Sequence, residues 1–339
     1  MHQITLEQPG RFIATNTAPE PESAPGHALV RVRRIGVCGT DLHAFAGEQP
    51  FFEYPRVLGH ELGVEVITAP TGSGLQAGDR CAVEPYLHCG RCLACRRGRT
   101  NCCEQLKVLG VHVDGGMQLH LAVPAEKLHR SEVLAFDQLA LVETLGIGAH
   151  AVERGAPERG EKVLVVGAGP IGLGVIQFAQ AAAANVAVMD LSEARLAFCR
   201  GQMGVERTVR VGQAEPAEAV RAAFGGELPT LVLDATGNRQ SMMSTFQVTG
   251  HGGRIVFVGL CRGEISFDDP NFHQRELTVL ASRNATAATL RHVIEQVEVG
   301  RVDTGPWITH RMDLMDLPDR FADLLGATGL IKAMINVDA

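Results

Sequence analysis

Hydrophobic and polar positions along the chain change their pattern near residue 151. Before it, short apolar runs are separated by Gly and Pro, as in ALVRVRRIGV (28–37), GVEVITA (63–69) and DRCAVEPY (79–86). Such runs are typical of irregular, mostly antiparallel β structure. After it, apolar runs alternate with helix-like stretches. The runs are KVLVVGAG (162–169), VAVMD (186–190), LVLDATG (231–237), RIVFVG (254–259) and LTVLAS (277–282). This alternation predicts a parallel sheet covered by helices on both faces.

The pattern changes again after about Ser282. A helix-like stretch at 287–299 is followed by short strand-like pieces around WITHRM (307–312) and KAMINV (332–337). The pattern alone leaves open which half of the chain these pieces join. Because 339 residues exceed what one hydrophobic core usually covers, we expect two domains.

An uncharged stretch of 27 residues, 163–189, is long enough for a membrane-spanning helix. It contains four glycines and Pro170, however, and it divides naturally into a strand, a glycine turn, a helix and a second strand. The N-terminal MHQITLEQPGRF lacks the basic start and apolar core of a signal peptide. We therefore expect no membrane partner.

Composition places the chain among ordinary globular proteins, with 45% hydrophobic and 20% charged residues. The net charge of −7 shows no basic face for nucleic acid, and the arginines between 91 and 99 are more simply the rim of a loop. Nine cysteines, an odd number without a secretory signal, indicate a reducing cytoplasm and metal sites or free thiols rather than disulfides.

The glycine-rich segment after the first apolar strand of the second half predicts a dinucleotide site. It reads Gly167-Ala168-Gly169-Pro170-Ile171-Gly172, and the next strand begins 14 residues after Gly172. The first glycine permits a tight turn, the second lets the backbone approach a pyrophosphate, and the third allows close packing of helix on strand. Pro170 suits a first helical turn, whose N–H groups bind phosphate.

Asp190 ends the second strand, 18 residues after Gly172. A carboxylate there accepts hydrogen bonds from both ribose hydroxyls and repels a 2′-phosphate. The sequence therefore predicts NAD rather than NADP. The alternative is a structural glycine turn with a surface aspartate.

A cysteine-rich segment, HCGRCLACRRGRTNCCE (88–104), holds five of the nine cysteines. Cys89, Cys92 and Cys95 are spaced C-x2-C-x2-C, and either Cys102 or Cys103 supplies a fourth thiolate. Four thiolates make a closed tetrahedral site, usually for zinc, with no position for substrate. An iron–sulfur cluster is the rival occupant. A zinc ion there would stabilise a loop and leave the chemistry elsewhere.

A sparser set of ligands lies upstream, in GVCGTDLH (36–43) and VLGHELG (57–63). Cys38, His60 and Glu61 offer three ligands with an open fourth position, as in a catalytic zinc site. Such a zinc polarises an alcohol oxygen while hydride passes to nicotinamide. Thr40 and His43 are suited to carry the alcohol proton to solvent. The alternative for Thr40 is a helix cap.

These motifs, together with GDRCAVEP (78–85), occur in the order found in the zinc-dependent medium-chain dehydrogenases, which include alcohol, sorbitol and threonine dehydrogenases. The chain resembles that family over its whole length. The resemblance implies a GroES-like β-rich catalytic domain over 1–151 and 285–339 and a Rossmann domain over 152–284. It also implies an active site in the cleft between them and a homodimer or homotetramer.

The resemblance implies roles for further residues. A structural zinc site spaced C-x2-C-x2-C-x7-C selects Cys103, and Arg195 flanks the adenosine. Glu143 in VETLGIGAH (142–150) is a further candidate ligand of the catalytic zinc, directly or through water, although Thr144 replaces the usual proline. Both carboxylates are kept as candidates, with Glu61 preferred.

Several stretches, among them QPFFEYPRVLGHE (49–61) and DPNFHQRELTVLASRNAT (269–286), are most similar to the sugar-acid branch of the family. Arg283 lies where that branch implies a cleft-facing arginine, and the alternative for it is a salt bridge. We therefore expect a cytoplasmic, NAD-dependent enzyme with two zinc ions that oxidises a secondary hydroxyl of a small polyol or sugar acid. The alternatives are a threonine or simple-alcohol dehydrogenase, a non-catalytic zinc-ribbon protein and an inactive homologue.

Overall fold

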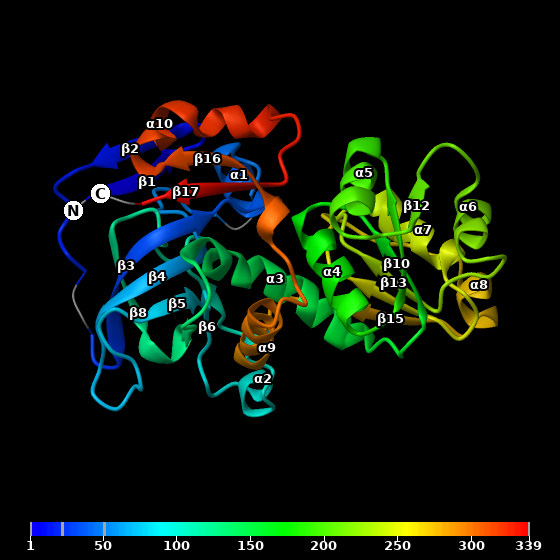
Figure 1. Cartoon of the computed structure of the whole chain (residues 1–339), viewed down its shortest axis with the longest axis horizontal. Coiled ribbons are helices and arrows are strands. Elements are labelled where there is room, and N and C mark those ends of the chain that lie inside the picture. The colour runs from blue at the N-terminus through cyan, green and yellow to red at the C-terminus, as the bar shows by residue number, and fades with distance from the viewer. Residues whose placement is uncertain (1, 22–23, 50–51, 338–339) are drawn as a thin grey trace. The chain divides into compact units, whose positions relative to one another are not determined.

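The structure is a computed structural model that describes residues 2–21, 24–49 and 52–337 (Figure 1). The chain divides into two compact units, residues 1–144 with 286–339, and residues 145–285. The first division falls inside helix α3 (Phe136–Gly155), as does the predicted domain boundary at 151/152.

The first unit is built on a seven-stranded sheet, with strand order β16-β17-β3-β4-β5-β9 and β8 paired to β3. All pairings are antiparallel except that of β16 with β17, which confirms the predicted β structure of the N-terminal half. The strands are β3 (His27–Gly36), β4 (Glu61–Thr68), β5 (Arg80–Val83), β8 (His120–Pro124), β9 (Leu128–Arg130), β16 (Ile308–Asp313) and β17 (Lys332–Asn336).

The C-terminal segment belongs to this first sheet. β17, drawn red in Figure 1, pairs antiparallel with the blue β3, with Ile335 opposite Ile35. The hydrophobic pattern left open which half of the chain the C-terminal segment joins. The pairing of β17 with β3 assigns it to the first unit. The remaining elements of this unit are β1 (Gln3–Gln8), β2 (Arg11–Thr15), α1 (Gly39–Phe45), β6 (Tyr86–Leu87), α2 (Leu93–Arg96), β7 (Lys107–Val108), α9 (Ala287–Glu298) and α10 (Leu317–Arg320).

The second unit is a six-stranded, fully parallel sheet in the order β12-β11-β10-β13-β14-β15. Its strands are β10 (Lys162–Val166), β11 (Asn185–Asp190), β12 (Arg207–Arg210), β13 (Leu231–Asp234), β14 (Arg254–Phe257) and β15 (Thr278–Ala281). Its helices are α4 (Pro170–Ala181), α5 (Glu193–Gln202), α6 (Pro216–Ala223), α7 (Arg239–Val248) and α8 (Asp269–Gln274). This is the doubly wound α/β architecture that the alternation predicted.

The uncharged stretch 163–189 is a strand, a turn, a helix and a second strand, as its glycines indicated. Val163, Leu164 and Val165 are fully buried, because both faces of a parallel sheet are covered. Within the described ranges, no helix is both long and apolar enough to cross a membrane.

Candidate metal and cofactor sites

Strand pairing brings three candidate ligands together. Cys38 follows β3, His60 precedes β4, and Glu61 begins β4 opposite Gly36. The thiol of Cys38, a ring nitrogen of His60 and a carboxylate oxygen of Glu61 all lie within 4.8 Å of one another. His60 and Glu61 are buried, and Cys38 is half-buried. One thiolate, one imidazole and one carboxylate form a donor set that suits zinc and leaves a fourth position.

Helix α1 holds Cys38 at its N-terminus. Cys38 is the N-cap residue, and its backbone N–H donates to the carboxylate of Asp41 at 2.9 Å. The ring of Phe45, at the other end of the helix, packs in a three-ring cluster with Phe12 and Phe321, with centroid distances of 5.4 and 5.1 Å. The helix is therefore fixed at both ends.

Thr40 and His43 lie one helical turn apart on α1. Thr40 is half-buried, whereas His43 is exposed and its Nδ1 lies 3.2 Å from Glu48. The alternative that Thr40 caps the helix is wrong, because Cys38 occupies the cap position. Of the two side chains, that of Thr40 is thus the more buried and that of His43 the more exposed.

Asp41 is a site residue that the motif analysis missed. Its Oδ1 lies 3.7 Å from Nδ1 of His60, and neither atom has a hydrogen-bond partner among the described residues. Burial alone would lower the pKa of His60, but the charges of Asp41 and Cys38 outweigh it and raise that pKa well above its usual value. A buried carboxylate facing the imidazole is the arrangement that orients a metal-binding histidine.

Lys332 is a second missed residue. Its Nζ lies 2.6 Å from both carboxylate oxygens of Glu61 and also donates to the carbonyl of Val37 at 3.2 Å. The side chains of both Lys332 and Glu61 are almost fully buried. Burial would lower the pKa of Lys332, but the Glu61 carboxylate raises it, so the ammonium stays charged. Glu61 therefore already has a cationic partner.

Glu143 lies on α3, outside the group of three donors within 4.8 Å. The hydroxyl of Tyr86, on β6, donates to its carboxylate, and both residues are buried. Burial raises the pKa of Glu143, and the nearby His60 opposes that rise. The structure thus brings Glu143 close enough to His60 to interact electrostatically, with Tyr86 as its hydrogen-bond donor.

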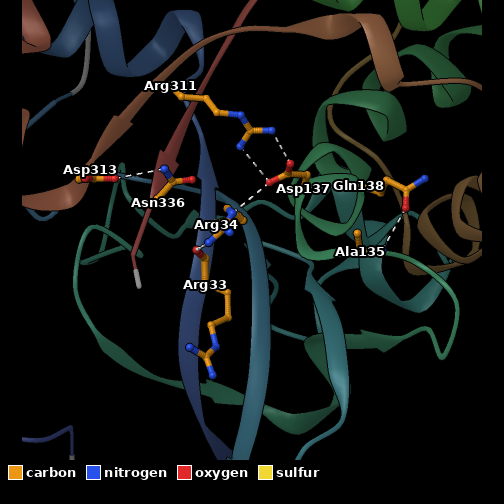
Figure 2. Close-up of polar contacts among 8 residues, drawn as sticks. All are labelled: Arg33, Arg34, Ala135, Asp137, Gln138, Arg311, Asp313 and Asn336. Carbon is orange, nitrogen blue, oxygen red and sulfur yellow. Dashed lines mark hydrogen bonds and ion pairs between the residues drawn. The ribbon is translucent and has the colours of Figure 1, made fainter. Parts of the chain in front are cut away.

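An ion-pair network fixes the helix that carries Glu143 (Figure 2). Asp137, in the first turn of α3, accepts from Nε of Arg34 at 3.0 Å and from both terminal nitrogens of Arg311 at 3.3 and 2.5 Å. Arg34 lies on β3 and Arg311 on β16. A carboxylate in the first helical turn also suits the helix dipole. The network therefore anchors α3 to two strands of the first sheet.

The cysteine lobe, residues 88–104, gathers four thiols. Sulfur atoms of Cys89, Cys92, Cys95 and Cys103 lie within 4.8 Å of one another, whereas Cys102 is exposed. Backbone N–H groups of Cys95 and Glu104 lower the pKa of Cys92 to about 6. The loop thus stabilises the thiolate of Cys92, whereas burial raises the pKa of Cys95 to about 12 in the metal-free lobe. A bound metal ion would have to deprotonate that thiol.

The two adjacent cysteines of the lobe give a direct test. We expect Cys103→Ser to lose the metal of the lobe and Cys102→Ser to keep it, because only Cys103 lies in the four-sulfur group. Metal content by mass spectrometry of the purified proteins measures the difference. Equal metal loss in both variants would contradict the arrangement.

The glycine turn of the second unit has the geometry that its sequence predicted. Gly167 has φ of +94°, a conformation open to glycine. A Cβ on Gly172 would lie 1.8 Å from the carbonyl oxygen of Gly167, so only glycine fits there. Gly169 is the N-cap of α4, and Pro170 and Ile171 form its first turn. Phosphate oxygens are bound by free backbone N–H groups at such helix starts.

Asp190 and Arg195 flank this turn. The two oxygens of Asp190 accept from the N–H groups of Ala168 and Ser192, each at 2.7 Å, and each oxygen keeps a second lone pair. Nη1 of Arg195 lies 4.0 Å from the position that a Cβ would take on Gly169. The guanidinium thus approaches the turn itself. Arg283 is exposed and follows β15.

Comparison with known proteins agrees with this geometry. Residues 24–133 match the family model described as alcohol dehydrogenase GroES-like domain, and residues 170–298 match the model described as zinc-binding dehydrogenase. The chain is 42% identical over 338 residues to L-galactonate-5-dehydrogenase of Escherichia coli K12, covering 99% of this chain and 98% of that protein.

Two solved structures share the fold over 99% of both chains. One is an alcohol dehydrogenase from Escherichia coli CFT073 complexed with NADH, with 28% identity and a TM-score of 0.92. The other is a zinc-binding dehydrogenase from Sinorhizobium meliloti 1021 bound to NADP, with 26% identity and a TM-score of 0.91. Both nicotinamide cofactors therefore occur on this fold.

Proposed function

Because this chain belongs to the zinc-type medium-chain alcohol dehydrogenase family and is an oxidoreductase acting on CH–OH groups, we propose that it oxidises a secondary hydroxyl of a sugar acid with NAD as hydride acceptor. The substrate class follows the relative with 42% identity, whose name specifies L-galactonate. The observation that carries the proposal is the convergence of Cys38, His60 and Glu61 on one point of the first unit.

We propose that Cys38, His60 and Glu61 hold the catalytic zinc ion. The donor set fits the ion, and Nδ1 of His60, which has no hydrogen-bond partner in the part of the chain that the structure describes, lies 3.7 Å from the carboxylate of Asp41, as suits a metal-bound imidazole. A zinc ion bound there would supply Lewis-acid polarisation of the alcohol oxygen. The cysteine lobe would hold a second, structural zinc, which makes about two zinc ions per chain.

The chain's own residues would then position the substrate and move its proton. We propose that Thr40 accepts the hydroxyl proton and passes its own proton on to His43, which is exposed and lies beside Glu48. Tyr86 holds the carboxylate of Glu143 by donating a hydrogen bond. Glu143 remains available as a further metal or substrate ligand, through one of its free lone pairs.

NAD is proposed over NADP because of Asp190. Its carboxylate is held at the end of β11 by two backbone N–H groups, so it cannot easily turn away from a ribose. A 2′-phosphate placed beside this carboxylate would be repelled by its negative charge. Arg195, near Gly169, supplies a positive charge for the adenosine side of the cofactor.

A substrate panel tests the proposal. We expect NAD reduction, followed by NADH absorbance, with L-galactonate and related aldonates, and at most about one tenth of that rate with NADP. Polyols, L-threonine and short alcohols complete the panel, and each reaction is repeated after zinc is removed with a chelator.

The panel also separates the alternatives. If the enzyme oxidises L-threonine or a short alcohol but neither aldonates nor polyols, it is a threonine or simple-alcohol dehydrogenase. No turnover, with zinc and NAD bound, would favour the inactive homologue. Preference for NADP would contradict the role assigned to Asp190.

We further propose a cytoplasmic homodimer or homotetramer. The described residues include all nine cysteines, and none of them forms a disulfide, as suits a reducing compartment. β15 is an edge strand of the parallel sheet, and Thr278, Val279 and Ala281 are exposed on it, which offers an edge to a second copy. Light scattering of the zinc-loaded protein measures the assembly, and a monomer would contradict the proposal.

A further inference from the structure

Asp234 is a fully buried carboxyl group of the second unit to which the proposed reaction assigns no role. It ends β13, inside the apolar run LVLDATG (231–237). A buried carboxylate is costly unless hydrogen bonds satisfy it. Its oxygens accept from the N–H and the hydroxyl of Thr236, at 2.9 and 2.6 Å, and from the hydroxyl of Ser241 at 2.6 Å. All three donors lie in the segment that follows the strand, so the side chain acts on that segment.

These hydrogen bonds set the shape of the loop 235–238. One carboxylate oxygen of Asp234 accepts both bonds from Thr236, whose hydroxyl oxygen accepts in turn from the backbone N–H of Asn238 at 3.0 Å. The other oxygen accepts from Ser241, in the first turn of α7. The backbone N–H of Ser241 donates to the side chain of Asn238, the N-cap residue of that helix, at 3.1 Å. A chain of hydrogen bonds therefore runs from Asp234 through the loop to the start of the helix.

The loop 235–238 lies where the strand order of the parallel sheet reverses. From β10 the chain adds β11 and β12 on one side, and then β13, β14 and β15 on the other. In open α/β sheets, ligands bind outside the carboxyl ends of the strands at such a point. The two segments that border it are the glycine turn after β10 and the loop 235–238 after β13. The loop therefore borders the position at which such a sheet binds a dinucleotide.

The loop and the glycine turn are in direct contact. A Cβ on Gly167 would lie 2.9 Å from Cγ2 of Thr236 and 3.3 Å from its backbone nitrogen. On the other side of the loop, a Cβ on Gly259 would lie 2.2 Å from the backbone nitrogen of Gly237, and a Cβ on Gly237 would lie 2.9 Å from the carbonyl oxygen of Leu260. The loop is thus packed between the segments that follow β10 and β14. Because Gly167 has no side chain between it and Thr236, a displacement of Thr236 would act on the glycine turn.

We propose that Asp234 is a positioning residue for the nucleotide cofactor. Its carboxylate holds Thr236 in place, and Thr236 supports the first glycine of the turn that binds the pyrophosphate. Asp234 is fully buried, so it acts through the loop and not by contact with the cofactor. A turn that is already ordered binds phosphate more tightly, because ordering a loose segment on binding costs free energy. The inference rests on the proposed binding of a dinucleotide at this turn.

Fluorescence titration of the zinc-loaded protein with NADH tests this role. We expect Asp234→Ala to raise the Kd of NADH about tenfold, the effect of losing one hydrogen bond to a charged group. Asp234→Asn should recover most of that loss, because an amide oxygen can accept both bonds from Thr236 and the amide N–H can donate to Ser241. KM for NAD should rise with the Kd. The value of kcat at saturating NAD should not fall, because the candidate zinc ligands belong to the first unit.

Thr245→Val is the matched control. Thr245 is fully buried on α7, and its hydroxyl donates to the carbonyl of Met242 at 2.6 Å, so the change removes a buried hydrogen bond that does not belong to the loop. It should lower the free energy of unfolding in urea and leave the Kd of NADH unchanged. If Asp234 only stabilised the fold, Asp234→Ala would behave in the same way. An equal Kd in the Asp234→Ala and control proteins would therefore overturn the proposal.

Ser241→Ala gives a second, milder variant should circular dichroism show that Asp234→Ala does not fold. It removes one of the three donors to the carboxylate and should raise the Kd of NADH by a smaller factor. An unchanged Kd in Ser241→Ala would then overturn the role of Asp234 alone. Wild-type protein that binds neither NADH nor NADPH would instead contradict the cofactor site itself, and this role with it. If the wild type binds only NADPH, the same titrations are made with NADPH and decide the role of Asp234 in the same way.

Discussion

Cys38→Ala is expected to remove one of about two zinc ions per chain and to lower kcat/KM at least about 1,000-fold, while the protein stays folded. Among the described residues the thiol is one of three donors within 4.8 Å, so its loss leaves the imidazole of His60 and the carboxylate of Glu61 to hold the ion. Lewis-acid stabilisation is worth several kcal/mol, and about 1.4 kcal/mol corresponds to tenfold in rate.

The measurement combines metal analysis, circular dichroism and the NADH assay. Cys81→Ala is the matched control, because Cys81 is a fully buried thiol of the same sheet outside both four-sulfur and three-donor groups. It should keep both ions. The catalytic assignment would be contradicted if the Cys38→Ala protein kept both zinc ions, or if it lost one ion and stayed fully active.

The same site is expected to bind zinc more weakly as the pH falls. His60 must be neutral to bind a metal, and its pKa in the metal-free protein is raised well above the usual value despite the lowering effect of burial, because Asp41 and Cys38 favour the imidazolium. Protons therefore compete with zinc near neutral pH. Asp41 therefore has two effects. It orients the imidazole ring of His60, and it makes zinc binding to the metal-free site depend on pH.

Local motifs predicted much of the fold and of the site from sequence. Five apolar runs of the second half became five strands of the parallel sheet, because continuous apolar runs suit strands that helices cover on both faces. β15 is the exception in burial, since it lies at the sheet edge and three of its four residues are exposed. The sixth strand, β12, was not predicted. Its sequence RTVR has charged ends, and it lies at the edge of the sheet, where Val209 alone of its four residues is buried.

The partners of the site residues could not be predicted in the same way. Lys332 and Glu61 are separated by 271 positions, and only the pairing of β17 with β3 brings them together. Tyr86 and Glu143 are likewise 57 positions apart. Asp41 was within reach of the motif analysis, because it follows Cys38 by three residues on the same helix. Cys102 and Cys103 are distinguished by a short 3₁₀ turn, 100–102, that ends between them.

The buried ion pair between Lys332 and Glu61 allows the sharpest test of the ligand set. Lys332→Met should lower the free energy of unfolding of the metal-free protein by about 3–5 kcal/mol, because it leaves a buried carboxylate without its partner. Lys332→Met with Glu61→Gln should recover most of that loss, because the second change removes the unpaired charge. Urea unfolding of the metal-free proteins measures both.

Repeating the unfolding measurements with zinc bound tests whether Glu61 coordinates the ion. If Glu61 binds the ion, zinc neutralises the carboxylate that Lys332→Met leaves unpaired, so the variant should lose clearly less stability with zinc than without it. If Glu61 stays outside the coordination shell, the loss should be equal with and without zinc, and Glu143 or water would complete the site. We expect the smaller loss with zinc, since a carboxylate oxygen of Glu61 lies within 4.8 Å of donors on both Cys38 and His60. Lys332 would then act as the cation that holds Glu61 in place until the metal arrives.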